Sequence, residues 1–150
     1  VSGVRFAAVT GRVESCVGGR PVEGWMGRDV VCGMESGEMI RTAKVEGGKG
    51  RALDGMMPHV TAKSAEFDCV TRSCGPKCGI EEDPVCGSGH CHVAPLWSRA
   101  LGKQSLVARQ ASRRGGTLYC ATDGGRVKIS GKATLYATAD IHIEALLKRR

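Results

Sequence analysis

The sequence predicts an α+β fold in which a mostly antiparallel sheet wraps around one central helix. Short segments in which apolar and polar residues alternate recur along the chain, as strands require. One long segment, Val93 to Leu101, instead places its apolar residues at helical spacing. A tight turn at Asp123-Gly124-Gly125 joins two alternating segments and is typical of a β-hairpin. The length of 150 residues suits a single domain with one core.

Before the central helix, the sequence predicts four strands and one short helix. The short helix follows Ser36, whose hydroxyl suits an N-cap. A glycine-rich, charged stretch from Glu46 to Gly55 is expected to be a surface loop. The strands are expected at Pro21–Trp25, Arg28–Met34, Met56–Ala62 and Glu66–Arg72, and the helix at Glu38–Lys44.

The central helix is expected to begin at Gly87-Ser88-Gly89, with Ser88 as its N-cap, and to end at Gly102. Pro95 lies inside the helical pattern and has no N–H, so we expect a kink there or a start nearer His92. Five further strands follow, of which the last two close the sheet. They are expected at Ser105–Ala111, Thr117–Ala121, Arg126–Ser130, Ala133–Ala137 and Asp140–Ile143.

The start of the central helix is also the strongest candidate for a functional site. Its glycine turn aims free N–H groups outward, and such a helix terminus binds anions. Three acids precede it, and Pro84 pushes Asp83 into an extended conformation at the mouth of the helix. A carboxyl held there can shuttle a proton or hydrogen-bond a reacting carbonyl. The alternative for Asp83 is a turn-forming role before proline.

Cys86 and His90 flank the same turn, and each has two interpretations. The helix terminus favours a thiolate at Cys86, but the nearby carboxylates oppose it, so a resting neutral thiol is expected. Cys86 is therefore either catalytic or a packed, half-buried thiol. His90 either donates to a bound carboxylate or is a capping or packed residue. His59 and His142 fall in strand patterns and are expected to be structural.

The charge and hydropathy of the sequence bear on the kinds of partner that the protein can bind. The net charge is +7, and residues 99–150 carry 11 Lys and Arg against 3 Asp and Glu. We interpret this surplus as a solvated sheet face that steers anionic substrates, because no aromatic interleaving or nucleic-acid motif accompanies it. The alternative is nucleic-acid binding. No apolar run approaches the roughly 20 residues of a membrane span, and the opening lacks a signal-peptide core, so the sequence predicts a cytoplasmic protein with no membrane partner.

The eight cysteines allow a zinc interpretation, which the spacing does not favour. Cys74 and Cys78, then Cys86 and Cys91 with two histidines, lack the C-x2-C pairs of structural zinc sites. We therefore expect no metal. We also expect no disulfides in a cytoplasmic chain. The cysteines expected to act as small apolar fillers are Cys16, Cys32, Cys69 and Cys120.

The run GIEEDPVCGSGHC, from Gly79 to Cys91, resembles the signature G-I-x-E-D-P-V-T-G-S-A-H-C of the PhzF, or phenazine biosynthesis-like, family. The resemblance extends from about residue 20 onward. Cys86 replaces the commoner threonine, which makes Cys-Gly-Ser-Gly similar to the Cys-Gly-x-Gly of diaminopimelate epimerase. Further matching segments are Gly27–Val31, Val60–Ala62, Glu66–Asp68, Ala94–Trp97, Leu101–Lys103, Ala108–Gln110, Ser112–Gly116, Gly125–Val127 and Ile129–Gly131.

The resemblance implies one half of a two-domain protein with the diaminopimelate-epimerase-like fold, and this chain looks like the C-terminal half. In the family the substrate lies between the halves, and the N-terminal half carries the general-base glutamate. The implied activity is that of an isomerase or epimerase that moves a proton next to a carboxylate or carbonyl without any cofactor. Asp83 would match the acidic site residue, and Gly87 and Ser88 would hold the substrate carboxylate.

The expected partners are a small carboxylate metabolite and either the missing N-terminal half or a second copy in a homodimer. At the helix start, the Gly89 amide and His90 are further expected contacts for the carboxylate. The alternative function is a non-catalytic small-anion-binding or protein-interaction domain. We expect residues 1–20 to be an unassigned lead-in segment, residues 21–146 to form the PhzF-like domain, and residues 147–150 to be a basic tail.

Overall fold

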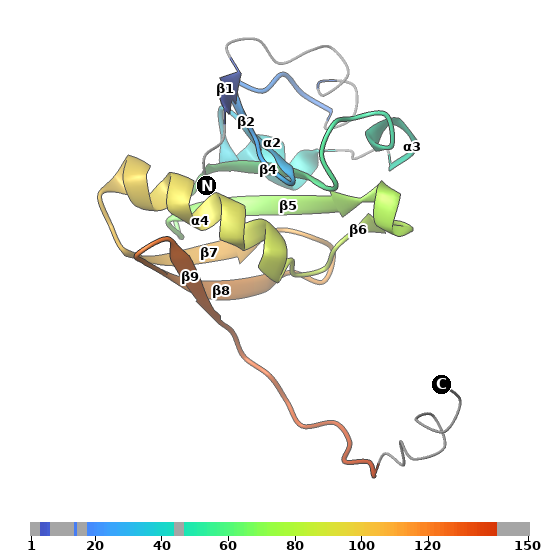
Figure 1. Cartoon of the computed structure of the whole chain (residues 1–150), viewed down its shortest axis with the longest axis vertical. Coiled ribbons are helices and arrows are strands. Elements are labelled where there is room, and N and C mark those ends of the chain that lie inside the picture. Colours follow the sequence, from blue (N-terminus) through green and yellow to red (C-terminus); the bar gives the residue numbers. More distant parts are fainter. Residues whose placement is uncertain (1–3, 7–13, 15–17, 44–46, 141–150) are drawn as a thin grey trace, which may run out of the picture.

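The computed structural model describes residues 4–6, 14, 18–43 and 47–140 (Figure 1). In these residues a nine-stranded sheet has the order β1-β2-β3-β4-β5-β7-β8-β9, with β6 paired to β5. All pairings are antiparallel except β3 with β4 and β5 with β7. The strands are β1 (Val4–Phe6), β2 (Glu23–Met26), β3 (Val30–Gly33), β4 (Pro58–Lys63), β5 (Cys69–Gly75), β6 (Ile80–Glu82), β7 (Ser105–Gln110), β8 (Gly116–Asp123) and β9 (Arg126–Ser130). The predicted α+β fold with a mostly antiparallel sheet is confirmed.

Helix α4 (Gly87–Leu101) lies across one face of the sheet, and α2 (Gly37–Thr42) lies on the other (Figure 1). Side chains alternate between these faces along each strand, as the pleat requires. Val31 of β3 packs with Val93 of α4, whereas its neighbour Val30 packs in a cluster with Ile40 of α2. The sheet therefore divides the core into two layers, one under α4 and one under α2.

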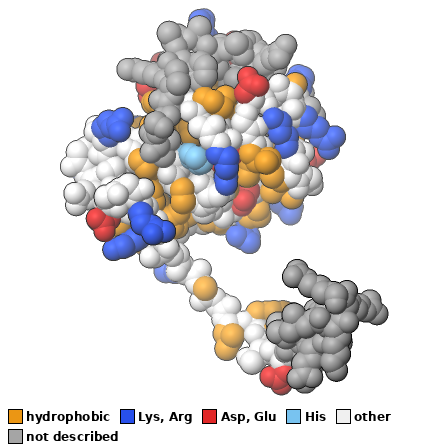
Figure 2. Space-filling model, viewed as in Figure 1, with side chains coloured by type: hydrophobic (Ala, Val, Ile, Leu, Met, Phe, Trp, Pro, Cys, Tyr) orange, Lys and Arg blue, Asp and Glu red, His pale blue; other side chains and the backbone are white. Residues whose placement is uncertain are grey.

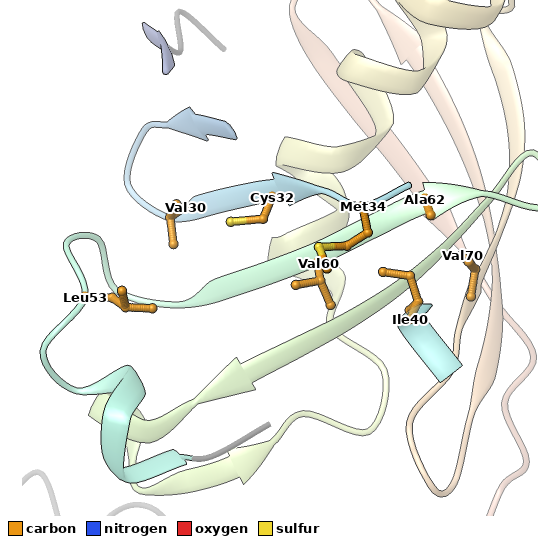
Figure 3. Close-up of a cluster of buried hydrophobic side chains, with 8 residues drawn as sticks. All are labelled: Val30, Cys32, Met34, Ile40, Leu53, Val60, Ala62 and Val70. Carbon is orange, nitrogen blue, oxygen red and sulfur yellow. The ribbon is translucent and has the colours of Figure 1, made fainter. Parts of the chain in front are cut away.

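Figure 3 shows the cluster of buried hydrophobic side chains on the α2 side. Its side chains come from alternate positions of β3, β4 and β5, and Ile40 closes it from the helix. Ser36 caps α2, as predicted, because its Oγ accepts a hydrogen bond from the Met39 N–H at 3.3 Å. The members of this cluster are Val30, Cys32, Met34, Ile40, Leu53, Val60, Ala62 and Val70.

The N-terminal boundary of α4 differs from the prediction. Cys86, not Ser88, is the N-cap: it is extended at φ −87° and ψ 102°, and its Sγ accepts the Gly89 N–H at 3.3 Å. The helix continues through Pro95 instead of beginning near His92, because the surrounding turn buries Val93 and Ala94. Gly102 ends it with φ +64°, the left-handed conformation for which glycine was expected.

Three further expectations change. The expected loop at Glu46–Gly55 contains a short helix, α3 (Gly47–Gly50), and a 3₁₀ turn, η1 (Pro76–Cys78), precedes β6. The strand expected at Glu66–Arg72 begins at Cys69, because the Ser64 hydroxyl accepts hydrogen bonds from the next residues and holds a turn. The lead-in segment contributes β1, which pairs with β2.

The strands expected at the C-terminal end are not formed in the described residues. After β9, residues 131–140 form an extended, exposed segment (Figure 1). Ala133–Ala137 is therefore wrong as a strand: its alternation has no neighbouring strand to bond with. Figure 2 shows hydrophobic side chains exposed along this segment. The structure does not describe Ile141 to Arg150 or Cys16. Most of the strand expected at Asp140–Ile143, the expected tail and His142 therefore lie outside the described residues.

Candidate active site

A short loop between β6 and α4 holds Asp83 in a defined position. The Asp83 N–H donates to the backbone oxygen of Ser73 at 2.9 Å, which ties the loop to β5. Asp83 Oδ1 accepts the Val85 N–H at 3.0 Å, which is the turn-forming bond of an aspartate before proline. The structure thus contains the turn that was the alternative for Asp83, and this turn fixes the carboxyl at the mouth of α4.

The side chain of Gln110, a buried residue at the end of β7, forms two hydrogen bonds with this loop. Its Nε2 donates to the Asp83 backbone oxygen at 2.6 Å, and its Oε1 accepts the Cys86 N–H at 3.0 Å. The hydroxyl of Ser112 donates to the Pro84 oxygen at 2.6 Å. Sequence reasoning missed Gln110. The available signal was its place in β7, where alternation with Leu106 and Ala108 puts an amide at an inward position.

Two backbone N–H groups at the start of α4 have no acceptor among the described residues: those of Gly87 and Ser88. Both residues are exposed, and a Cβ on Gly87 would meet nothing within 4 Å. The 15-residue helix places the positive end of its dipole at the same point. Free N–H groups at a helix N-terminus are suited to hydrogen-bond a small oxyanion, and the Asp83 carboxyl lies on the loop that enters this helix.

The Gly89 N–H, by contrast, is already occupied, because it donates to the Cys86 thiol. His90 is also turned inward and is buried. Its Nδ1–H donates to the Cys86 backbone oxygen at 2.7 Å, so its Nε2 accepts from the Thr71 hydroxyl at 3.2 Å. Burial lowers the pKa of His90 and keeps it neutral. Of the four expected carboxylate contacts, Gly87 and Ser88 thus have free donors, whereas Gly89 and His90 hold the helix start together.

Cys86 is a neutral, buried thiol next to the acidic residue. Burial raises its pKa, an effect that hydrogen bonds from Ser88 and the Gly89 N–H reduce and the Asp83 charge reinforces. The residue as a whole is 1% exposed. The geometry therefore brings Asp83, Cys86 and Ser88 together, with Cys86 as a protonated group that caps the helix.

A second buried network lies beneath the first turns of α4. The His59 Nε2 lies 3.2 Å from Asp29 Oδ2, and its Nδ1 lies 2.9 Å from the Ser73 hydroxyl. Burial lowers the His59 pKa to about 4, so the neutral ring donates to the Asp29 carboxylate and accepts from Ser73. His92 is a further partner of Asp29, at 3.3 Å. His59 is thus structural, as expected, but it lies at the helix start and not merely within a strand.

The position of His59 explains one difference between this sequence and the family signature. A Cβ on Gly89 would stand 2.7 Å from His59 Cε1, closer than two such atoms approach. The alanine of the signature would therefore clash with the imidazole ring, and glycine at position 89 leaves room for it. His59 and Gly89 are a matched pair in this chain.

All the buried polar residues lie on the α4 side of the sheet, and each buried side-chain nitrogen or oxygen in the described residues has a partner. Among those residues no group of three or more His, Cys, Asp or Glu could hold a metal ion. Adjacent candidates point apart, because His90 is buried whereas Cys91 is exposed. No helix in the described part of the chain is long and apolar enough to span a membrane.

A cavity of about 820 Å³ opens beside the first turn of α4. Gly87 lies on its wall, and the ends of β8 and β9 form its other side. Three cationic residues line it, Arg109, Arg114 and Lys132, and no lining residue is acidic. The basic surplus that the sequence indicated is therefore partly gathered next to the helix start.

The fold defines a protein of the diaminopimelate-epimerase-like class, in which a mostly antiparallel sheet packs around a central helix. The model of the family described as phenazine biosynthesis-like protein (PhzC-PhzF) matches residues 29–139, so the chain belongs to that family. The identification made from the Gly79–Cys91 run is confirmed.

Relatives and solved structures agree with this assignment. Two Pseudomonas aeruginosa proteins named uncharacterized isomerases are similar to it: PA2770, 50% identical over 56% of this chain, and PA3578, 40% identical over 73% of it. A crystal structure of a PhzF-family protein from Enterococcus faecalis superimposes on 90% of the chain with a TM-score of 0.78 and 32% identity. A crystal structure of a putative PhzC/PhzF protein from Clostridium difficile superimposes on 95% of the chain with a TM-score of 0.83 and 32% identity.

The chain spans only part of each of these proteins. It covers 32% and 42% of the two Pseudomonas relatives and 55% of each solved structure.

Proposed function

We propose that this chain is the C-terminal half of a PhzF-like isomerase or epimerase, which moves a proton next to a carboxylate or carbonyl of a small metabolite. One observation carries the proposal: the two free N–H groups of Gly87 and Ser88 lie at the N-terminus of α4, beside the fixed carboxyl of Asp83. The relatives that are named isomerases support the reaction class.

In this proposal each residue has a separate task. The amides of Gly87 and Ser88 hold the substrate carboxylate, aided by the helix dipole. Asp83 donates a proton or hydrogen bond where charge develops during the reaction. Cys86, as a neutral thiol that caps α4, keeps those amides in place, and it is a second proton carrier that interacts with Asp83. The residues require neither a metal nor an organic cofactor for these tasks.

The other half of the cleft must come from elsewhere. In the family that this chain resembles, the N-terminal half supplies a general-base glutamate. We therefore propose that the chain alone does not turn over substrate, and that a separate N-terminal half or a second copy completes the site. Turnover by a monomer of this chain would contradict that part of the proposal.

A pair of substitutions at Gly87 tests the anion site. Gly87→Pro removes one N–H at the first helical position, which proline tolerates, and the preceding Cys86 already has the extended backbone that proline demands. Gly87→Ala adds a Cβ into open space but keeps the N–H. We expect Gly87→Pro to weaken binding of butyrate roughly tenfold, as the loss of a hydrogen bond to a charged group implies.

Binding is measured by titration with NMR detection of the backbone amides. Gly87→Ala should bind butyrate as the unaltered chain does. Equal effects of the two substitutions would mean that the carboxylate does not use this amide, and the proposed site would be wrong.

A further inference from the structure

The cavity beside α4 combines features that a single carboxylate does not use. One wall carries Gly87, whose N–H is free, and the three cations Arg109, Arg114 and Lys132 stand around the rest of the lining. None of these cations forms an ion pair with a carboxylate of the described residues. A cavity with one sign of charge raises the local concentration of the opposite sign.

The guanidinium of Arg109 lies beside Gly115 and bonds to the side chain of Thr117. Gly115 has φ +68°, and a Cβ there would stand 2.5 Å from Arg109 Nη2. Glycine at 115 therefore leaves the space that the guanidinium occupies. The Arg109 Nη1 donates to the Thr117 hydroxyl across the β7–β8 pair at 3.4 Å. Arg109 is thus positioned by the fold, unlike a solvated surface arginine.

Part of the cavity lining is aliphatic. Val85, Leu118 and Ile129 contribute aliphatic side chains to it. Gly116 allows this close packing, because a Cβ there would stand 2.4 Å from Val85 Cγ2. The cavity therefore combines a free backbone N–H at Gly87, three aliphatic side chains and three cationic side chains in one lining.

We propose that this cavity binds a small molecule with two oxyanion groups, and that Arg109, Arg114 and Lys132 hold the second one. The first oxyanion lies at Gly87 and Ser88, so the inference rests on the proposed function for that end. A short apolar carbon frame spans the aliphatic lining between the two ends. The second group is a carboxylate or a phosphate, because guanidinium and ammonium groups bind both.

The test compares three probes: butyrate, with one anionic end; glutarate, with two carboxylates; and 3-phosphonopropionate, with a carboxylate and a phosphonate. We expect the unaltered chain to bind glutarate or 3-phosphonopropionate about 3- to 10-fold more tightly than butyrate, as partly solvated ion pairs imply. The tighter of the two identifies the second group. The preference should shrink with added salt, because charges at a solvated rim are screened. Equal affinity for all three probes would overturn the proposal.

Matched double variants localise the effect. Arg114→Gln with Lys132→Gln removes two exposed cavity cations, and Arg113→Gln with Arg126→Gln removes two exposed cations that do not line the cavity. We expect the first pair, which leaves only Arg109, to reduce the preference for the two-ended probes and the second pair to preserve it. Equal losses in both would reveal a general charge effect and overturn the proposal. All four residues are exposed, and unfolding curves verify that both variants fold.

The two proposals fail separately. If Gly87→Pro leaves butyrate binding unchanged while the two-ended probes still depend on Arg114 and Lys132, the placement of the first carboxylate is wrong and the cationic subsite stands. If Gly87→Pro weakens butyrate binding but glutarate and 3-phosphonopropionate show no preference, the subsite is wrong and the proposed function stands.

Discussion

Asp83 is restrained through its backbone and through one carboxylate oxygen, which is what a proton-transferring group at a helix mouth requires. Its N–H bonds to β5, its backbone oxygen bonds to Gln110, and its Oδ1 accepts the Val85 N–H. A carboxyl fixed in this way does not need to be reordered when the substrate binds. The turn that Asp83 forms is therefore compatible with the catalytic role proposed for it.

Replacing Asp83 by asparagine separates binding from proton transfer. Asparagine keeps an oxygen for the Val85 N–H but cannot act as an acid, so we expect turnover in the completed enzyme to fall about 10²- to 10⁴-fold. Carboxylate binding by the chain should be unchanged or slightly tighter, because a negative charge beside the anion is removed. Deuterium uptake from solvent into the substrate measures the first effect, and amide titration the second. Unchanged deuterium uptake would favour a role for Asp83 in the turn alone.

His59 makes the stability of the chain depend on pH. Its pKa is about 4 in the folded chain because of burial, against 6.5 for the free side chain, so the unfolded chain binds an additional proton between these values. Stability should therefore fall as the pH is lowered from about 6.5 to about 4, by on the order of 3 kcal/mol for His59. His90 and His92, whose pKa values burial also lowers, add to this fall.

Urea unfolding at pH 7 and pH 4.5 measures the effect. His59→Gln can still donate to Asp29 and accept from Ser73, and it has no proton to gain in this range. The variant should show a smaller fall in stability than the unaltered chain. An identical pH dependence would mean that His59 is not the buried neutral group described above. Asp29 does not contribute in this window: burial acts to raise its pKa, but hydrogen bonds from Arg28 and His59 outweigh burial and lower it below 3.8.

At the scale of the element, α4 depends on an unusual cap. The Cys86 thiol accepts the Gly89 N–H, and the Cys86 N–H and carbonyl bond to Gln110 and His90. Threonine, which the family signature has at this position, supplies a better acceptor of similar size. The backbone at Cys86 is extended, which a β-branched residue favours.

Threonine and valine at position 86 differ in one atom that can cap the helix. We expect Cys86→Thr to change the free energy of unfolding by less than Cys86→Val, and the two variants to differ by about 1 kcal/mol, the usual value of an N-cap side chain. Urea unfolding measures the difference. Equal stabilities would show that the thiol contributes packing alone and that the cap bond has no net effect.

At the scale of the whole molecule, residues 133–140 belong to no helix or strand and do not line the cavity beside α4. Residues 133–140 are exposed, and Leu135 and Tyr136 are 84% and 100% exposed. Apolar side chains held on an extended segment are typical of a surface that another chain covers. This observation agrees with the proposal that a second polypeptide completes the cleft.

A chain that ends at Lys132 tests whether the fold is independent of residues 133–150. It retains every described strand and helix, so we expect its unfolding temperature to match that of the full chain. The native mass of both chains is then measured by size-exclusion chromatography with light scattering, at low and high concentration. If the full chain associates with itself, we expect the shortened chain to associate more weakly. A large loss of stability on truncation would contradict the independence of the domain from this segment.

The sequence by itself determined the class of fold, the central helix and the start of the site. Alternating segments predicted most strands because one face of each packs on α4 or α2, and Gly102 and Asp123-Gly124-Gly125 marked the helix end and the hairpin because their backbones need glycine. The Gly79–Cys91 run indicated the family because so many residue types recur at fixed spacing.

Only the tertiary structure decided which groups are free. Whether the amides of Gly87, Ser88 and Gly89 have partners depends on where the Cys86 thiol turns, and the role of Gln110 depends on β7 passing behind the loop. The contact of His59 with Gly89 joins residues 30 positions apart on different elements. The segment at Ala133–Ala137 has the alternation of a strand, but a strand also needs a neighbour with free hydrogen-bonding groups, and local pattern carries no information about that neighbour.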